Sequence, residues 1–141
     1  MQYKHTQIGF PIIISSLVVA ILISINLFLD FSDFRFFSFL LLSVSVVCVL
    51  SFSILTITID EKAVILKYGC LDFLKKKFPL EDIKSSCIVK QPWYYGWGIR
   101  FTSEGWLFRV GGLYSVRIEV KSGKVFFIGS DEPEKMLRTI R

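Results

Sequence analysis

The chain opens with two long apolar runs. Ile8–Leu29 and Phe36–Leu55 contain no charged residue, whereas the short break between them holds three. A helix needs about 20 apolar residues to cross a hydrocarbon core of roughly 30 Å, and each run has that length. The pattern therefore predicts a transmembrane hairpin in residues 1–55. Its helices are expected at about 8–29 and 36–55, after a short polar start.

From Leu55 the apolar positions alternate with polar ones. Leu55–Asp60 alternates strictly, as expected of a strand with one buried face. Ser115–Lys121 does the same, with Val116, Ile118 and Val120 on one face, and Ser122-Gly123 is a hairpin signal. We expect about seven short antiparallel strands between residue 56 and the C-terminal segment.

The C-terminal segment changes period once more. Asp131 followed three residues later by Glu134 resembles a capping box, and Pro133 suits the first turn of a helix. The apolar stripe that follows consists of Met136, Leu137 and Ile140. One amphipathic helix is therefore predicted to close the chain, which is expected to be an α+β membrane protein.

Charge is concentrated after the hairpin. Residues 56–141 hold 15 of the 17 Lys and Arg and 10 of the 12 Asp and Glu, so the whole excess of five positive charges lies there. The positive-inside rule then predicts both termini and the 56–141 domain in the cytoplasm, with the break near Asp30–Arg35 outside. The nearest polyanion for such a domain is an anionic leaflet, and nucleic-acid binding is not expected.

The supply of reactive side chains is small. The only histidine is His5, and Cys48, Cys70 and Cys87 form no C-x-x-C pair. Serine–histidine catalysis and a metal centre both need such groups brought together. We therefore expect no enzyme activity, no metal and no cofactor.

Lys75, Lys76 and Lys77 form the strongest local positive feature. They would suit contact with anionic lipid headgroups at a membrane surface. Lysines on a strand also prevent edge-to-edge aggregation, and this structural reading competes with the functional one.

The segment Gln91–Gly98 is rich in aromatic residues. Trp93, Tyr94, Tyr95 and Trp97 would suit a recognition loop or an interfacial anchor. Alternatively, Trp97 packs in the domain and only the other three are free. Arg100 beside them would pair with Glu104 or with an anionic ligand, and the pair inside the domain is the expected outcome.

Three glycine-containing motifs carry a family resemblance. Gly96–Arg100, Val110–Val116 and Ile128–Pro133 resemble, in order and spacing, the motifs of small bacterial membrane proteins with a pleckstrin-homology-like (PH-like) domain. Two hydrophobic helices commonly precede the domain in that family. The resemblance implies a PH-like β-barrel whose open end is capped by the C-terminal helix. The glycines suit tight bends, so the motifs mark the fold and not a reaction.

The resemblance does not supply a ligand. Phosphoinositide-binding PH domains place several basic residues in the loop between their first two strands, whereas here that loop is the mostly acidic Asp60-Glu61-Lys62. We expect a non-catalytic, membrane-tethered interaction module that docks an unknown protein partner or helps to assemble a membrane complex. A module that senses anionic lipid or the membrane surface is the alternative. Homo-oligomerisation through the helices fits either.

Overall fold

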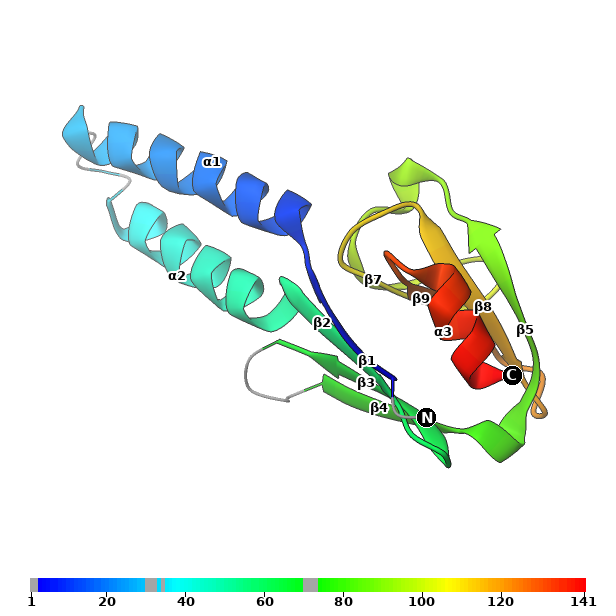
Figure 1. The fold of residues 1–141 in the computed structure, drawn as a ribbon. Coiled ribbons are helices and arrows are strands. Elements are labelled where there is room, and N and C mark those ends of the chain that lie inside the picture. The colour runs from blue at the N-terminus through cyan, green and yellow to red at the C-terminus, as the bar shows by residue number, and fades with distance from the viewer. Residues whose placement is uncertain (1–2, 30–32, 34, 70–73) are drawn as a thin grey trace.

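The computed structural model of the protein describes residues 3–29, 33, 35–69 and 74–141. Two apolar helices project from a domain built of two sheets and a C-terminal helix (Figure 1). The α+β class and the two N-terminal helices are as predicted. The closed barrel is not found in the described part of the chain, because β4 of the first sheet and β5 of the second do not pair.

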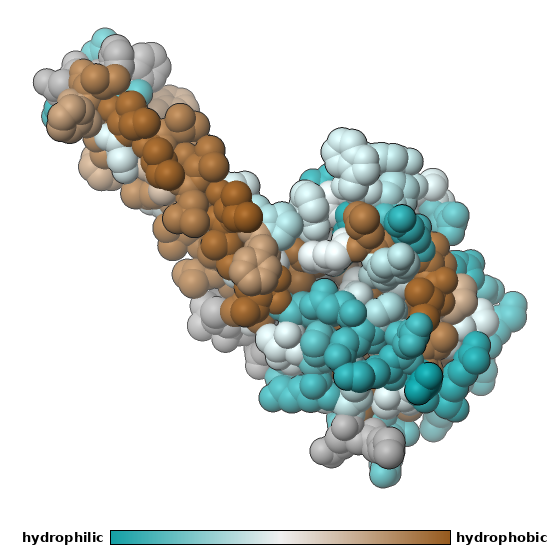
Figure 2. All heavy atoms as spheres, turned by 45° about the horizontal axis from the view of Figure 1, so that its top comes forward, coloured by the Kyte–Doolittle hydropathy of each residue, from teal (hydrophilic) through white to brown (hydrophobic). Residues whose placement is uncertain are grey.

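The helices α1 (Phe10–Phe28) and α2 (Arg35–Phe52) are long and apolar enough to cross a membrane. At 1.5 Å per residue, each is about 28 Å long. Figure 2 shows them as a continuous hydrophobic rod, with most of the hydrophilic surface on the domain. Both are shorter than predicted, because Ile8 and Leu55 belong to strands.

The four-stranded sheet continues the hairpin directly. Its order is β1-β2-β3-β4, and all neighbours are antiparallel. The short polar start expected before the first helix contains a strand that was not predicted, β1, which pairs with β2 along its whole length. β1, which precedes the hairpin in sequence, therefore belongs to the same sheet as strands that follow it. The strands are β1 (Tyr3–Ile8), β2 (Ile54–Ile59), β3 (Ala63–Tyr68) and β4 (Leu74–Pro79).

The five-stranded sheet has the order β5-β8-β9-β7-β6. β9 inserts between β8 and β7, and β7 and β9 are parallel. The prediction of a purely antiparallel sheet is therefore wrong. The turn signal at Ser122-Gly123 predicted the hairpin between β8 and β9. No local signal indicated that β7 pairs with β9. The strands are β5 (Ile83–Lys90), β6 (Gly98–Phe101), β7 (Trp106–Arg109), β8 (Tyr114–Val120) and β9 (Val125–Gly129).

The two sheets enclose one core. Alternation along the strands turns residues such as Leu55, Ile57, Val116 and Ile118 inward, and these are fully buried. The helix α3 (Pro133–Ile140) packs on β5 and β8 through its buried Met136. The amphipathic helix is as predicted.

The capping box predicted for α3 is wrong. The N-cap is Glu132, which makes no side-chain cap hydrogen bond. Asp131 lies instead beside β1, with its Oδ2 3.7 Å from His5 Nε2. The sequence did not indicate that β1 joins the domain. It therefore did not indicate that His5 of β1 would lie beside Asp131.

Candidate functional site

The lysine run lies on β4, an edge strand of the four-stranded sheet. Successive side chains of a strand point to opposite faces. Lys75 and Lys77 therefore share the outer face, whereas the Lys76 ammonium lies 5.4 Å from the centroid of the Phe126 ring at the other face. The three lysines do not form one contact surface.

The strand register places lysines of β1 and β3 on the same outer face as Lys75 and Lys77. Lys67 of β3 pairs with Lys75, and Lys4 of β1 lies in the row that runs through Thr58 and Ile65 to Lys77. We call Lys4, Lys67, Lys75 and Lys77 the basic face. Lys4 and Lys67 were missed from sequence, because only the pairing of β1 with β2 brings them into register.

The aromatic segment follows β5 and includes a short 3₁₀ helix, η3 (Trp93–Tyr95). Trp93 and Tyr94 are 71% and 66% exposed, whereas Trp97 is 37% exposed. Gly96 after η3 has φ +70°, a backbone conformation that suits glycine. Trp93 and Tyr94 are thus exposed, whereas Tyr95 is half-buried and Trp97 is only partly packed.

Arg109 holds this segment from inside the domain. The side chain is fully buried, and its Nε and Nη2 donate to the Gly96 carbonyl at 3.0 and 2.7 Å. Nη2 also lies 3.4 Å from the Pro92 carbonyl, and the guanidinium carbon lies 5.9 Å from the Trp97 ring centroid. Burial lowers the pKa of Arg109. Nothing in the sequence distinguishes this arginine from the exposed ones, and it was missed.

Arg100 lies against the outside of the same segment. A side chain on Gly96 would approach the Arg100 guanidinium carbon to 3.1 Å, so glycine makes this close packing possible. The expected pair of Arg100 with Glu104 is not formed, because Glu104 lies 4.0 Å from Arg117 Nε instead. Within residues 3–29, 33, 35–69 and 74–141, Arg100 makes no ion pair.

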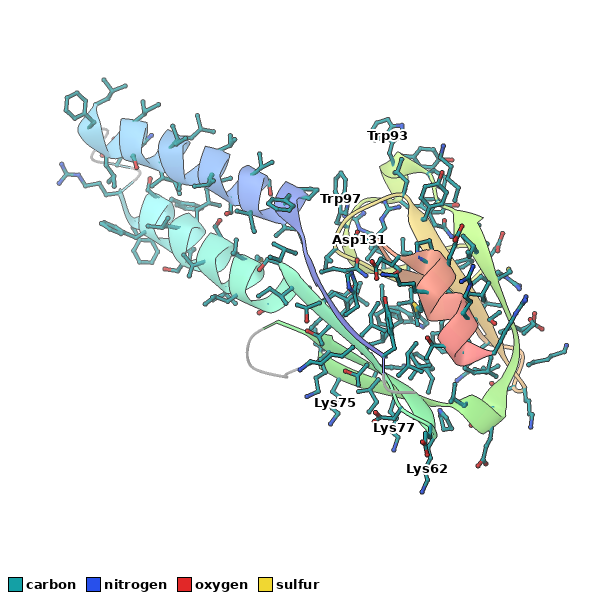
Figure 3. The ribbon with its side chains drawn as sticks, in the orientation of Figure 1. Lys62, Lys75, Lys77, Trp93, Trp97 and Asp131 are labelled. Atoms are coloured by element: carbon teal, nitrogen blue, oxygen red, sulfur yellow. The ribbon has the colours of Figure 1, made fainter. Side chains whose placement is uncertain are left out.

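The aromatic segment meets the hairpin at a hollow of about 280 Å³, which we call the junction hollow. Ile12, Cys48 and Phe52 line it from the helices, and residues 97–100 line it from the domain. Trp97 lies beside the start of α1, whereas Lys75, Lys77 and Lys62 follow one another along the four-stranded sheet at increasing distance from the helices (Figure 3). The two sets of candidate residues therefore belong to different parts of the domain, the lysines to β4 and the aromatic residues to the connection between β5 and β6.

A larger groove of about 550 Å³ lies between β5, β8 and the start of α3, and we call it the β5–α3 groove. Ile88 and Tyr114 form its apolar part, and they are 36% and 49% exposed. β5 is an edge strand of its sheet. It pairs with β8 on one side, and its other backbone edge pairs with no strand of the described chain. The remaining lining residues are Asp131, Glu132, Pro133, Glu134 and Lys135.

The described residues form no cluster of metal ligands. Among the described residues, no three His, Cys, Asp or Glu side chains are close enough to hold a metal ion.

Comparisons with protein-family models, curated proteins and solved structures give no match. The PH-like resemblance and the bacterial source therefore remain predictions.

Proposed function

We propose that the protein is a membrane-tethered, non-catalytic docking module that binds an extended segment of a protein partner in the β5–α3 groove. The observation that carries this proposal is the open edge of β5 beside that groove. A sheet edge offers unpaired N–H and C=O groups along its length, and an extended peptide can add to it as a further strand.

The four sheet ends differ in how well they suit such pairing. β4 carries Lys75 and Lys77, and lysine on an edge strand discourages pairing. β6 has only four residues, and β1 has Asp131 beside its His5. β5 has eight residues, and its middle is uncharged from Ser85 to Val89. This strand is the longest in the described chain and the best suited to take up a partner.

The groove also supplies side-chain recognition. Ile88 and Tyr114 can take an apolar anchor from the peptide, because both line the groove and are partly exposed. Three carboxylates and one ammonium line its α3 side, namely Asp131, Glu132, Glu134 and Lys135. Lys135 Nζ already lies 2.7 Å from Glu132 Oε1, so the remaining charge is negative. The expected partner segment is extended, with an apolar anchor next to a basic residue.

The arrangement of the lysines favours docking over the lipid-sensing alternative. That alternative expects the lysine run and the aromatic loop to share one face toward the bilayer. The lysines lie on β4 and the aromatic loop connects β5 to β6 of the other sheet, and the lysine side chains alternate between two faces. The basic face therefore provides charge and solubility, and β4 is protected from edge pairing.

A peptide-binding experiment on the full chain in nanodiscs tests the proposal. Peptides would be selected from a random display library and then measured against groove variants. We expect Ile88→Asp to weaken binding about tenfold or more, because a buried apolar anchor contributes at least about 1.4 kcal/mol. Tyr114→Ser is a second variant, chosen because Tyr114 is half-exposed and its loss leaves the core intact.

Phe101→Ser provides the matched control. Phe101 is 72% exposed on β6, outside the groove, so its replacement removes a similar amount of apolar surface. Peptides that bind wild type and Phe101→Ser alike but not Ile88→Asp support the proposal. Failure to enrich any peptide, or equal binding by all variants, would contradict it.

A further inference from the structure

An apolar groove runs between the two helices and continues into the junction hollow. The interhelical groove has a volume of about 260 Å³ and is lined by apolar and small residues of α1 and α2. Ile12 and Cys48 line both this groove and the junction hollow. We call the interhelical groove and the junction hollow together the apolar track. It leads from the surface of the hairpin to the part of the domain that adjoins the helices.

A cation lies where the track reaches the domain. Arg100 lines the junction hollow together with Trp97, and it pairs with no carboxylate in the described part of the chain. Ile12 is in the first turn of α1 and Phe52 is the last residue of α2. If the hairpin spans the bilayer, these ends lie at the interface, so Arg100 and Trp97 lie at the level of the headgroups.

We infer that the junction hollow binds one anionic phospholipid, with its phosphate on Arg100, the Trp97 indole beside the glycerol region and an acyl chain in the interhelical groove. The occupant follows from the combination of a cation that pairs with no carboxylate among the described residues and an apolar track that opens along the helices. The inference rests on membrane insertion of the hairpin. It is independent of peptide binding in the β5–α3 groove.

Arg109 acts in this site as a positioning residue. Its Nε and Nη2 hold the Gly96 carbonyl from inside, and its guanidinium faces the Trp97 ring. The loop is therefore fixed before a lipid arrives, and Arg100 lies against Gly96 on the other side. Preorganisation of this kind strengthens binding, because little conformational freedom remains to be lost.

Bromine quenching of Trp97 fluorescence tests the site. The full chain with Trp93→Phe and Trp106→Phe would be placed in two bilayers of identical composition, phosphatidylcholine with phosphatidylglycerol. Bromine is carried by phosphatidylglycerol in one bilayer and by phosphatidylcholine in the other, so surface charge is the same in both. We expect an association constant about fivefold higher for phosphatidylglycerol at Trp97.

Charge variants assign the preference to a residue. Arg100→Gln is expected to abolish it and Arg100→Lys to retain most of it, whereas Lys75→Gln with Lys77→Gln should leave it unchanged. Loss of the preference in the Lys75 and Lys77 variant, with retention in Arg100→Gln, would overturn the assignment. Equal quenching by both brominated lipids in the chain that keeps only Trp97, with Arg100 intact, would overturn the site while leaving insertion intact.

Two further outcomes separate the site from its premise. Absence of quenching by either lipid would show that Trp97 does not meet the bilayer, which overturns insertion and the site together. Relief of quenching by added inorganic phosphate would show that Arg100 takes a free anion, which overturns the lipid assignment. Persistence of the preference in excess phosphate supports it.

Discussion

A buried arginine organises the loop that faces the hairpin. Arg109 is fully buried, and its hydrogen bonds go to backbone carbonyls of the aromatic segment. Carbonyl oxygens stabilise a cation that has lost its water. Gly129 makes room for the side chain, because a Cβ there would lie 2.7 Å from Arg109 Cγ. The φ of Gly129 is not positive, so its role here is to admit this side chain.

Replacing Arg109 is expected to lower the free energy of unfolding. Arg109→Ala leaves the Gly96 carbonyl without a donor and opens a cavity, with an expected loss of about 3 kcal/mol. Chemical unfolding of the full chain in detergent, followed by near-ultraviolet circular dichroism of the tryptophans, measures it. Arg138→Ala on the exposed face of α3 is the matched control and should change stability by less than about 0.5 kcal/mol. Equal effects of the two substitutions would contradict the role assigned to Arg109.

The edge strand β5 is attached to the sheet by a small polar cluster as well as by its backbone. Glu119 of β8 accepts hydrogen bonds from Lys84 at 3.3 Å and Ser85 at 3.5 Å, both on β5. Arg117 lies 3.4 Å from the same carboxylate. The hydrogen bond from Lys84, and then its charge, hold the pKa of Glu119 below its usual value, with a smaller contribution from Arg117.

Acid is therefore expected to loosen β5. A carboxylate whose pKa is lowered by folding stabilises the native state above its unfolded pKa, near 4.5, and this contribution is lost as the pH falls through the folded pKa. Amide hydrogen exchange in Ile83–Lys90 should rise relative to β9 as the pH falls below about 4.5. Glu119→Gln should remove this pH dependence, whereas Glu81→Gln, a control outside the cluster, should keep it. An unchanged acid response in Glu119→Gln would show that another group is responsible.

Elements with a strong local pattern were predictable, and the contacts between distant elements were not. The periodicity of Leu55–Asp60 and of Ser115–Lys121 gave strands close to those observed, because each alternates between buried and half-buried positions. β1 was missed because its six residues acquire a buried face only against a strand beyond the hairpin. The candidate site followed the same rule. Trp93 and Tyr94 were predictable as exposed aromatics, whereas Arg109 is defined by long-range packing.

The hairpin and the four-stranded sheet form one continuous antiparallel structure. β1 leads through Gly9 into α1, and α2 returns through Ser53 into β2. The Gly9 N–H donates to the Ser53 carbonyl at 2.6 Å, so the two chains stay paired where strand changes to helix. A Cβ on Gly9 would lie 2.8 Å from the Val110 carbonyl oxygen, which brings the five-stranded sheet close to the same point. Both sheets are thus joined to the foot of the hairpin.

This continuity predicts the membrane topology. Because β1 pairs with β2 over six residue pairs, residues on either side of the hairpin must lie on one side of any membrane that the helices cross. Single cysteines would replace Lys4, Asp33 and Lys121 in a chain whose own cysteines are changed to serine. An impermeant thiol reagent applied to intact cells and to inverted vesicles should label Lys4→Cys and Lys121→Cys from the same side and Asp33→Cys from the other. The excess of basic residues after the hairpin predicts that the shared side is the cytoplasm. Labelling of positions 4 and 121 from opposite sides would be incompatible with the β1–β2 pair, and accessibility of all three from one side would show that the hairpin does not span the bilayer.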